Sequence, residues 1–423
     1  MALKLTALLI ATGTLLSLRA DDFQGSTHLM PYDEDTLQYS KAREDNAISR
    51  LQARIDSGAV KFAWDEKFGY LPDLLRELKV ATNSQSLVFS KTSLQRERIS
   101  PKNPRALYFN DDIYLGFIPG SPILEVSVAD PKLGGVFYTF EQKPTERPKF
   151  TRTDQCLECH ASAKTMGVPG HLLRSFETDS AGSVDLATGT SLLTHRTPLE
   201  ERWGGWYVTG AHGDQLHRGN LIGKEAFKRQ ATEPNHKGNL DSLSEFFETK
   251  HYPAASSDIV ALMTLEHQAH MHNFITRLNY AGTLAMAQYG HVNYLKSIVE
   301  AFVRYTLYVE EAPLKAPLKG NTRFAEDFAA QGPKDSQGRS LRDFDLKTRL
   351  FKHPCSFLIH SEAFDALPQP VKERVYARLW EVLSGKEKSA DYERLTPDNR
   401  KAIREILAET KPGLPEYWTK PGA

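Results

Sequence analysis

The chain has 423 residues, of which 25% are charged and 40% are hydrophobic, as in an ordinary globular protein. Its 53 basic and 53 acidic residues give a formal net charge of zero, so the chain has no excess of positive charge for binding nucleic acid. A chain of this length can bury a large core and usually forms two or three structural units.

The first segment, residues 1–20, has the pattern of a secretory signal peptide. Lys4 gives a short positive start, and an apolar stretch follows from Leu5 to Leu18. This stretch is too short to span a bilayer, and Asp21 ends it abruptly. We therefore expect cleavage after Ala20 and a periplasmic or secreted protein without a transmembrane anchor. The alternative is an ordinary apolar N-terminal helix.

The second region, residues 21–150, is expected to begin with helices and to continue as an antiparallel β-meander. Apolar residues at three- and four-residue steps predict two helices, one carrying Ile48, Leu51 and Ile55 and the other carrying Leu71, Leu74, Leu75 and Leu78. Short runs rich in aromatic and β-branched residues, separated by Asn, Asp, Gly and Pro, predict four strands, over residues 106–109, 113–118, 123–128 and 136–140.

The third region, residues 151–240, is rich in glycine and loops and contains the most informative motif. The segment from Cys156 to His160 has the C-x-x-C-H pattern by which c-type haem is attached covalently. In that pattern the thiols of Cys156 and Cys159 each bond one vinyl group of the porphyrin, and the imidazole of His160 is the proximal iron ligand. We therefore expect one covalent haem c.

Other interpretations of these cysteines are weaker. A structural zinc site needs four ligands, usually from a second pair of Cys or from a pair of His, and the chain has only three Cys. A thioredoxin-like redox pair needs no His after the second Cys, and a plain disulfide is the remaining option. The third cysteine, Cys355, lies outside any such motif, so it marks no second haem. We expect it to be a buried free thiol, with an intermolecular disulfide as the alternative.

The chain downstream of the motif is expected to change from loops to helices. One more strand is predicted over residues 202–210, and residues 241–423 are expected to be mainly helical. Three helices are predicted there: one from Ser256 or Ser257 to about Gln288, one over residues 371–383, and one that starts at Thr396-Pro397-Asp398 and ends before Pro412. The expected fold class is therefore α+β, with a β-meander and a haem-bearing region followed by a helical part.

The second axial position of the iron separates an electron carrier from a haem enzyme. Met166 follows His160 by only six residues, which is unsuited to the Met ligand of small cytochromes. Histidine is better supplied, because ten of the 14 His lie between His160 and His272. His267 is the first candidate, since it lies on an apolar face of the predicted long helix. The other candidates are His171, His212, His217 and His270, and an open position is the further alternative.

The segment from Cys156 to His160 resembles the haem-binding site of c-type cytochromes. More broadly, residues 104–111, 202–210 and 361–368 resemble segments of large secreted bacterial cytochrome c domain-containing proteins, a group without a settled activity. The resemblance spans most of the mature chain and implies a single haem held by Cys156, Cys159 and His160.

These observations predict a periplasmic cytochrome that exchanges electrons with a redox partner protein or a small-molecule donor or acceptor. The alternative is a mono-haem oxidoreductase with an open distal site, peroxidase-like or acting on a small inorganic substrate. A haem-based sensor of small gases is a third possibility, which rests on analogy of fold alone. The sequence assigns no catalytic residue.

Overall fold

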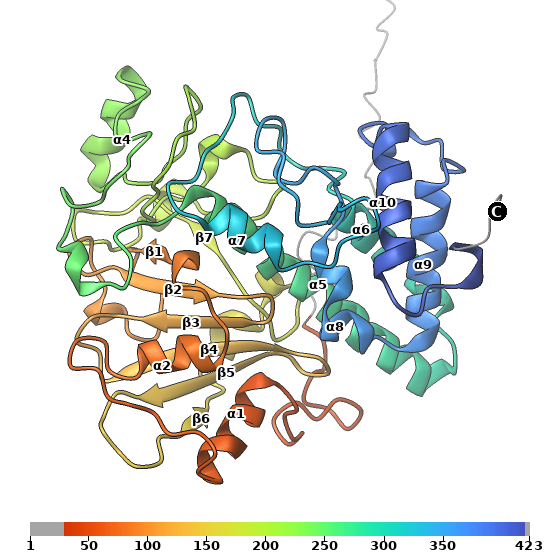
Figure 1. Cartoon of the computed structure of the whole chain (residues 1–423), viewed down its shortest axis with the longest axis horizontal. Coiled ribbons are helices and arrows are strands. Elements are labelled where there is room, and N and C mark those ends of the chain that lie inside the picture. The colour runs from red at the N-terminus through yellow and green to blue at the C-terminus, as the bar shows by residue number, and fades with distance from the viewer. Residues whose placement is uncertain (1–28, 419–423) are drawn as a thin grey trace, which may run out of the picture.

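A six-stranded antiparallel sheet forms one half of the protein, and a group of helices forms the other half (Figure 1). The structure is a computed structural model that describes residues 29–418. The predicted signal peptide, residues 1–20, lies outside the described residues. The fold is α+β, as the sequence predicts.

The sheet is a meander, because each strand pairs antiparallel with the next strand along the chain. Its strands are β1 (Ser86–Val88), β2 (Arg105–Phe109), β3 (Ile113–Phe117), β4 (Ile123–Asp130), β5 (Gly134–Glu141) and β6 (Phe150–Arg152). The four predicted strands are β2 to β5. The edge strands β1 and β6 have three residues each, too few to give a recognisable alternation.

Two short helices cover one face of the sheet (Figure 1). They are α1 (Ala47–Asp56) and α2 (Leu71–Glu77), and they bury the predicted apolar residues against the strands. Asn46 caps α1, because its side chain accepts hydrogen bonds from the amides of Ile48 and Ser49. The amide nitrogen of the same side chain donates to Asp130 at 3.0 Å, which fixes the start of α1 to the end of β4.

The long helix α5 (Ile259–Tyr289) joins the sheet to the remaining helices (Figure 1). It begins slightly later than predicted, because Asp258 caps it instead of lying in its first turn. The Asp258 carboxylate accepts from the amide of Val260 at 2.8 Å. Most of the helix is buried on all sides, as expected for a helix enclosed between a sheet and other helices.

The rest of the described chain consists of short helices and one small hairpin. The helices are α3 (Leu157–His160), α4 (Gly223–Thr232), α6 (Lys296–Thr306), α7 (Phe324–Ala330), α8 (Glu362–Asp365), α9 (Gln369–Leu383) and α10 (Pro397–Thr410). The hairpin pairs β7 (Arg174–Ser175) with β8 (Ser191–Leu192). The two predicted C-terminal helices are α9 and α10. Between residues 29 and 418, no helix has the length and apolar character needed to cross a bilayer.

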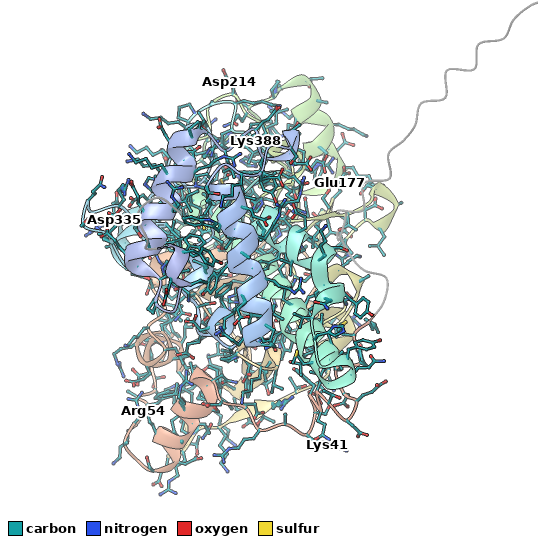
Figure 2. The ribbon with its side chains drawn as sticks, turned by 90° about the vertical axis from the view of Figure 1, so that its right-hand side faces the viewer. Lys41, Arg54, Glu177, Asp214, Asp335 and Lys388 are labelled. Carbon is teal, nitrogen blue, oxygen red and sulfur yellow. The ribbon has the colours of Figure 1, made fainter. Side chains whose placement is uncertain are left out.

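Charged side chains of both signs cover the side of the molecule that carries α9 and α10 (Figure 2). Lys41 and Arg54 lie at one end of this side, and Asp214 and Lys388 lie at the other end. This mixture agrees with the zero net charge of the sequence.

The strand predicted over residues 202–210 is wrong. Trp203 and Gly205 have φ angles of 70° and 84°, which turn the chain and break the extended conformation. The segment instead makes isolated bridges, such as the one between Val88 and Trp206. Its aromatic residues are buried although the segment is a coil: the indole nitrogen of Trp203 donates to Glu266, and that of Trp206 donates to the Arg174 carbonyl.

Candidate haem-attachment site

The helix α3 presents the two thiols of the C-x-x-C-H motif. The amide of His160 donates to the carbonyl of Cys156 at 2.9 Å, which closes a single helical turn. Residues three apart on a helix lie on the same side, so Cys156 and Cys159 are neighbours. Both thiols are free; Cys159 is exposed and Cys156 is partly buried. The arrangement leaves two unbonded sulfur atoms available to one ligand.

The imidazole of His160 is oriented for binding a metal through its outer nitrogen. Its Nδ1 lies 2.9 Å from the carbonyl oxygen of Gly170. Because a carbonyl can only accept, Nδ1 carries the proton, and Nε2 keeps its lone pair. A histidine ligand is commonly oriented by this kind of hydrogen bond on its other nitrogen. Burial lowers the pKa of His160, which favours the neutral form that binds iron.

The segment from Met166 to Gly170 forms a tight turn behind His160. Met166 has a φ of 61°, and the amide of Gly170 donates to the carbonyl of His160 at 2.8 Å. The amide of Gly135 on β5 donates to the carbonyl of Pro169 at 2.8 Å, which joins the turn to the sheet. A Cβ on Gly170 would lie 2.2 Å from Oδ1 of Asn273, so this position needs glycine.

The helix α5 clamps the same turn from the other side. Oδ1 of Asn273 accepts from the amide of His171 at 2.8 Å, and its Nδ2 donates to the His171 carbonyl at 2.7 Å. One turn further along the helix, Arg277 donates to the carbonyl of Met166 at 3.0 Å. The carbonyl that orients His160 is therefore held by the sheet and by α5 together.

The electrostatics of Cys156 differ from those of a reactive redox thiol. Burial, with the charge of Glu125 adding to it, raises the pKa of Cys156 to about 11. The nucleophilic cysteine of a thioredoxin-like pair has a lowered pKa instead. Arg105 forms an ion pair with Glu125 at 2.6 Å and offsets only part of this effect. Cys156 is thus a neutral thiol at neutral pH, which counts against the redox-disulfide interpretation.

His267, the first distal candidate, is placed as a histidine of the core. Its Nδ1 lies 2.8 Å from Nδ1 of His195, and its Nε2 lies 2.9 Å from Oγ of Ser356. The side chain is 0% exposed. Both ring nitrogens are therefore engaged within the protein, and this arrangement gives no support to iron binding by His267.

Two other distal candidates, His212 and His217, contact each other in the loops before α4. Their ring centroids are 4.5 Å apart. The Nε2 atom of His212 accepts from the amide of Asn239, and Nδ1 of His217 accepts from the amide of Gly219. Each ring thus uses a nitrogen to hold its own loop, and the structure does not bring either ring to the motif.

His171 is the candidate that lies closest to the motif in the chain and in space. Its ring lies 4.2 Å from that of Tyr114 and 6.1 Å from that of Phe137, which in turn packs at 4.9 Å on His160. Neither nitrogen of His171 has a hydrogen-bond partner in the protein. Both ring nitrogens of His171 are therefore free of protein partners, and His171 stays a distal candidate.

His270 differs from the other candidates because it lines a cavity, together with residues of β8 and of the segment that follows β8. Sequence reasoning identified Cys156, Cys159 and His160, and the Pro169-Gly170 pair indicated a turn close to the haem, but it missed Asn273. Nothing local marks Asn273, which lies 102 residues from its partner.

No family model, curated protein or solved structure matches the chain. Over residues 29–418, no group of three or more His, Cys, Asp or Glu side chains is arranged around a common metal position. Haem iron takes only one nitrogen from the proximal side of the protein, so that finding does not bear on it. The resemblance to secreted cytochrome c domain-containing proteins stays a prediction.

Proposed function

We propose that the protein is an exported mono-haem c-type cytochrome that transfers single electrons. The group would be held by thioether bonds to Cys156 and Cys159, with His160 as the proximal ligand of the iron. When bound, haem c supplies a one-electron iron couple. The observation that carries the proposal is the 2.9 Å contact of His160 Nδ1 with the Gly170 carbonyl, next to two free thiols.

The exposure of the motif favours electron transfer over a buried catalytic role. Cys159 is exposed, so the edge of a haem attached there would lie near the surface. A redox partner protein or a small-molecule donor or acceptor could then approach that edge. The rigid support of His160 by β5 and α5 would keep the proximal ligand fixed while the iron changes its charge.

A mono-haem oxidoreductase is the second candidate, and one observation favours it. The cavity beside α5 contains the side chains of Arg196 and His270. Proton transfer and charge stabilisation in haem enzymes use these residue types. This candidate requires a sixth iron position that is open to an external ligand.

Visible spectra separate the two candidates. The ferric protein is measured with and without cyanide, and the reduced protein is measured with and without carbon monoxide. An electron carrier with two strong axial ligands gives a low-spin spectrum that these ligands leave unchanged. A high-spin spectrum that changes on adding cyanide would contradict the electron-transfer proposal and favour the oxidoreductase. A reversible one-electron redox titration of the same sample is the supporting measurement.

A further inference from the structure

Two buried histidines lie close together between the sheet and α5. His171 directly follows the turn that orients His160, and His272 lies on α5. The two residues are 5% and 2% exposed, and their ring centroids are 6.0 Å apart. The ring of Tyr114 on β3 packs on both, with its centroid 4.2 Å from that of His171 and 6.2 Å from that of His272. The pair is therefore enclosed by elements of the sheet and of α5.

The Nδ1 atom of His272 carries a lone pair that no donor in the described chain contacts. Nε2 of this ring lies 2.7 Å from the carbonyl oxygen of Asp111. Because a carbonyl can only accept, Nε2 carries the proton and Nδ1 keeps its lone pair. Nδ1 is buried and makes no hydrogen bond within residues 29–418. A backbone carbonyl orients metal-binding histidines in the same way, so His272 has the tautomer of a metal ligand.

The imidazole of His171 has no hydrogen-bond partner on either nitrogen among the described residues. Its backbone is held on both sides by the Asn273 side chain, so the ring has a fixed origin. Burial, with the nearby His272 adding to it, lowers the pKa of His171 well below its ordinary value. The ring is therefore neutral, and one of its nitrogens offers a lone pair. A buried polar atom without a partner costs free energy and indicates a bound water or ligand.

Gln268 supplies a third acceptor, one turn before His272 on α5. Its Nε2 donates to the carbonyl of Asn110 at 2.8 Å and to the hydroxyl of Tyr114 at 3.1 Å. The carbonyl fixes the orientation of the amide, because only the nitrogen end can donate to it. The other end, Oε1, is buried and has no hydrogen-bond partner in the described part of the chain. Residues four apart share one side of a helix, so Gln268 and His272 project from the same face of α5.

The three side chains together offer three lone pairs, which favours a cation over a water molecule. One water has two hydrogens to donate, so it cannot satisfy three acceptors. A divalent transition-metal ion can bind all three, and imidazole is a preferred ligand of such ions. With zinc–nitrogen bonds of about 2.0–2.1 Å, two imidazoles on one ion have ring centroids about 5–6 Å apart. The separation of 6.0 Å between His171 and His272 fits this range.

We propose that His171, His272 and Gln268 bind a divalent transition-metal ion, with water as a further ligand. The set has two histidines and an amide, so it differs from a group of three or more His, Cys, Asp or Glu side chains, which residues 29–418 lack. The site does not depend on haem, so either proposal can fail alone. With His171 bound to this ion, the sixth ligand of the haem iron comes from another group.

Equilibrium dialysis of the exported full-length protein against Zn²⁺, followed by elemental analysis, tests the proposal. The protein is purified without a histidine tag and stripped with EDTA, and where haem is absent, the thiols of Cys156 and Cys159 are alkylated so that they do not bind zinc. We expect saturable binding of about one zinc ion per chain. In His171→Gln and in His272→Gln the affinity should fall at least about tenfold, because loss of an outer partner of a ligand alone costs about 10–100-fold.

The matched control is His251→Gln, which removes an exposed imidazole and should change the affinity less than about twofold. No saturable binding, or equal affinity in all three variants, would overturn the proposal. Crystals of the unaltered protein grown with Zn²⁺ give a second test that no variant can compromise by misfolding. Anomalous scattering should place zinc about 2.0–2.3 Å from one nitrogen of His171 and from Nδ1 of His272. Water in that position, or zinc bound only elsewhere, would contradict the proposal.

Discussion

At the scale of single residues, the two histidines that the sequence singled out have opposite surroundings. His160 uses Nδ1 to hold a carbonyl and keeps Nε2 available, whereas His267 uses both nitrogens within the core. The spacing of Cys156, Cys159 and His160 could be predicted because the chemistry requires residues that are adjacent in the chain. The partners of His267 could not be predicted, since His195 and Ser356 come from distant segments.

Removal of the His267 side chain should therefore destabilise the fold and leave the haem spectrum unchanged. His267→Ala leaves Ser356 and His195 without their partners and opens a cavity in the core, so the free energy of unfolding should fall by about 2–5 kcal/mol. The control His251→Ala removes an exposed imidazole and should alter it by about 0.5 kcal/mol or less. Urea unfolding and the visible spectrum are the measurements. A changed spectrum with unchanged stability would restore His267 as the distal ligand.

At the scale of elements, α5 organises the site because it closes the turn that orients His160. The sequence predicted this helix well, since its apolar length and the capping Asp258 are local signals. The strands β2 to β5 were also predicted, because their runs of aromatic and β-branched residues and the turn residues between them are local signals. Residues 202–210 were predicted wrongly, because the aromatic residues were given more weight than the Gly204-Gly205 pair, a local turn signal that agrees with the positive φ of Gly205.

Loss of the clamp on α5 should loosen the turn without unfolding the protein. In Asn273→Ala, the amide of His171 loses its acceptor, so its hydrogen exchange should become at least about tenfold faster. Asn279→Ala on the same helix removes a hydrogen bond to the carbonyl of Pro131 instead, and should leave the exchange of His171 unchanged. Equal exchange at His171 in both variants would show that α5 does not hold the turn.

At the scale of the whole molecule, the buried histidines set the response to pH. Burial is the main cause that lowers the pKa of His270 to about 3 and those of His272 and His360 to about 4. Burial lowers the pKa values of four more histidines well below the ordinary value: His171, His195, His217 and His267. Burial raises the pKa values of three acids, Asp112, Glu266 and Glu311, to about 7, which has the opposite effect on stability. The histidines outnumber these acids.

The free energy of unfolding should therefore fall as the pH is lowered from about 6.5 to about 4. In this window the unfolded chain protonates its histidines and the folded protein does not, so the unfolded state binds more protons and is favoured. Each such histidine contributes up to about 1.4 kcal/mol per pH unit, and the three acids offset part of the sum. Urea unfolding at a series of pH values measures this slope. Stability that is constant or rises toward pH 4 would contradict the prediction.

The intact mass of the exported protein, together with its pyridine hemochrome spectrum, tests the central claim most directly. The protein should be purified from a host that attaches c-type haem. We expect the mass of the chain cleaved after Ala20 plus one haem, and a hemochrome band typical of two thioether bonds. The mass of the bare polypeptide, without a hemochrome band, would contradict the account.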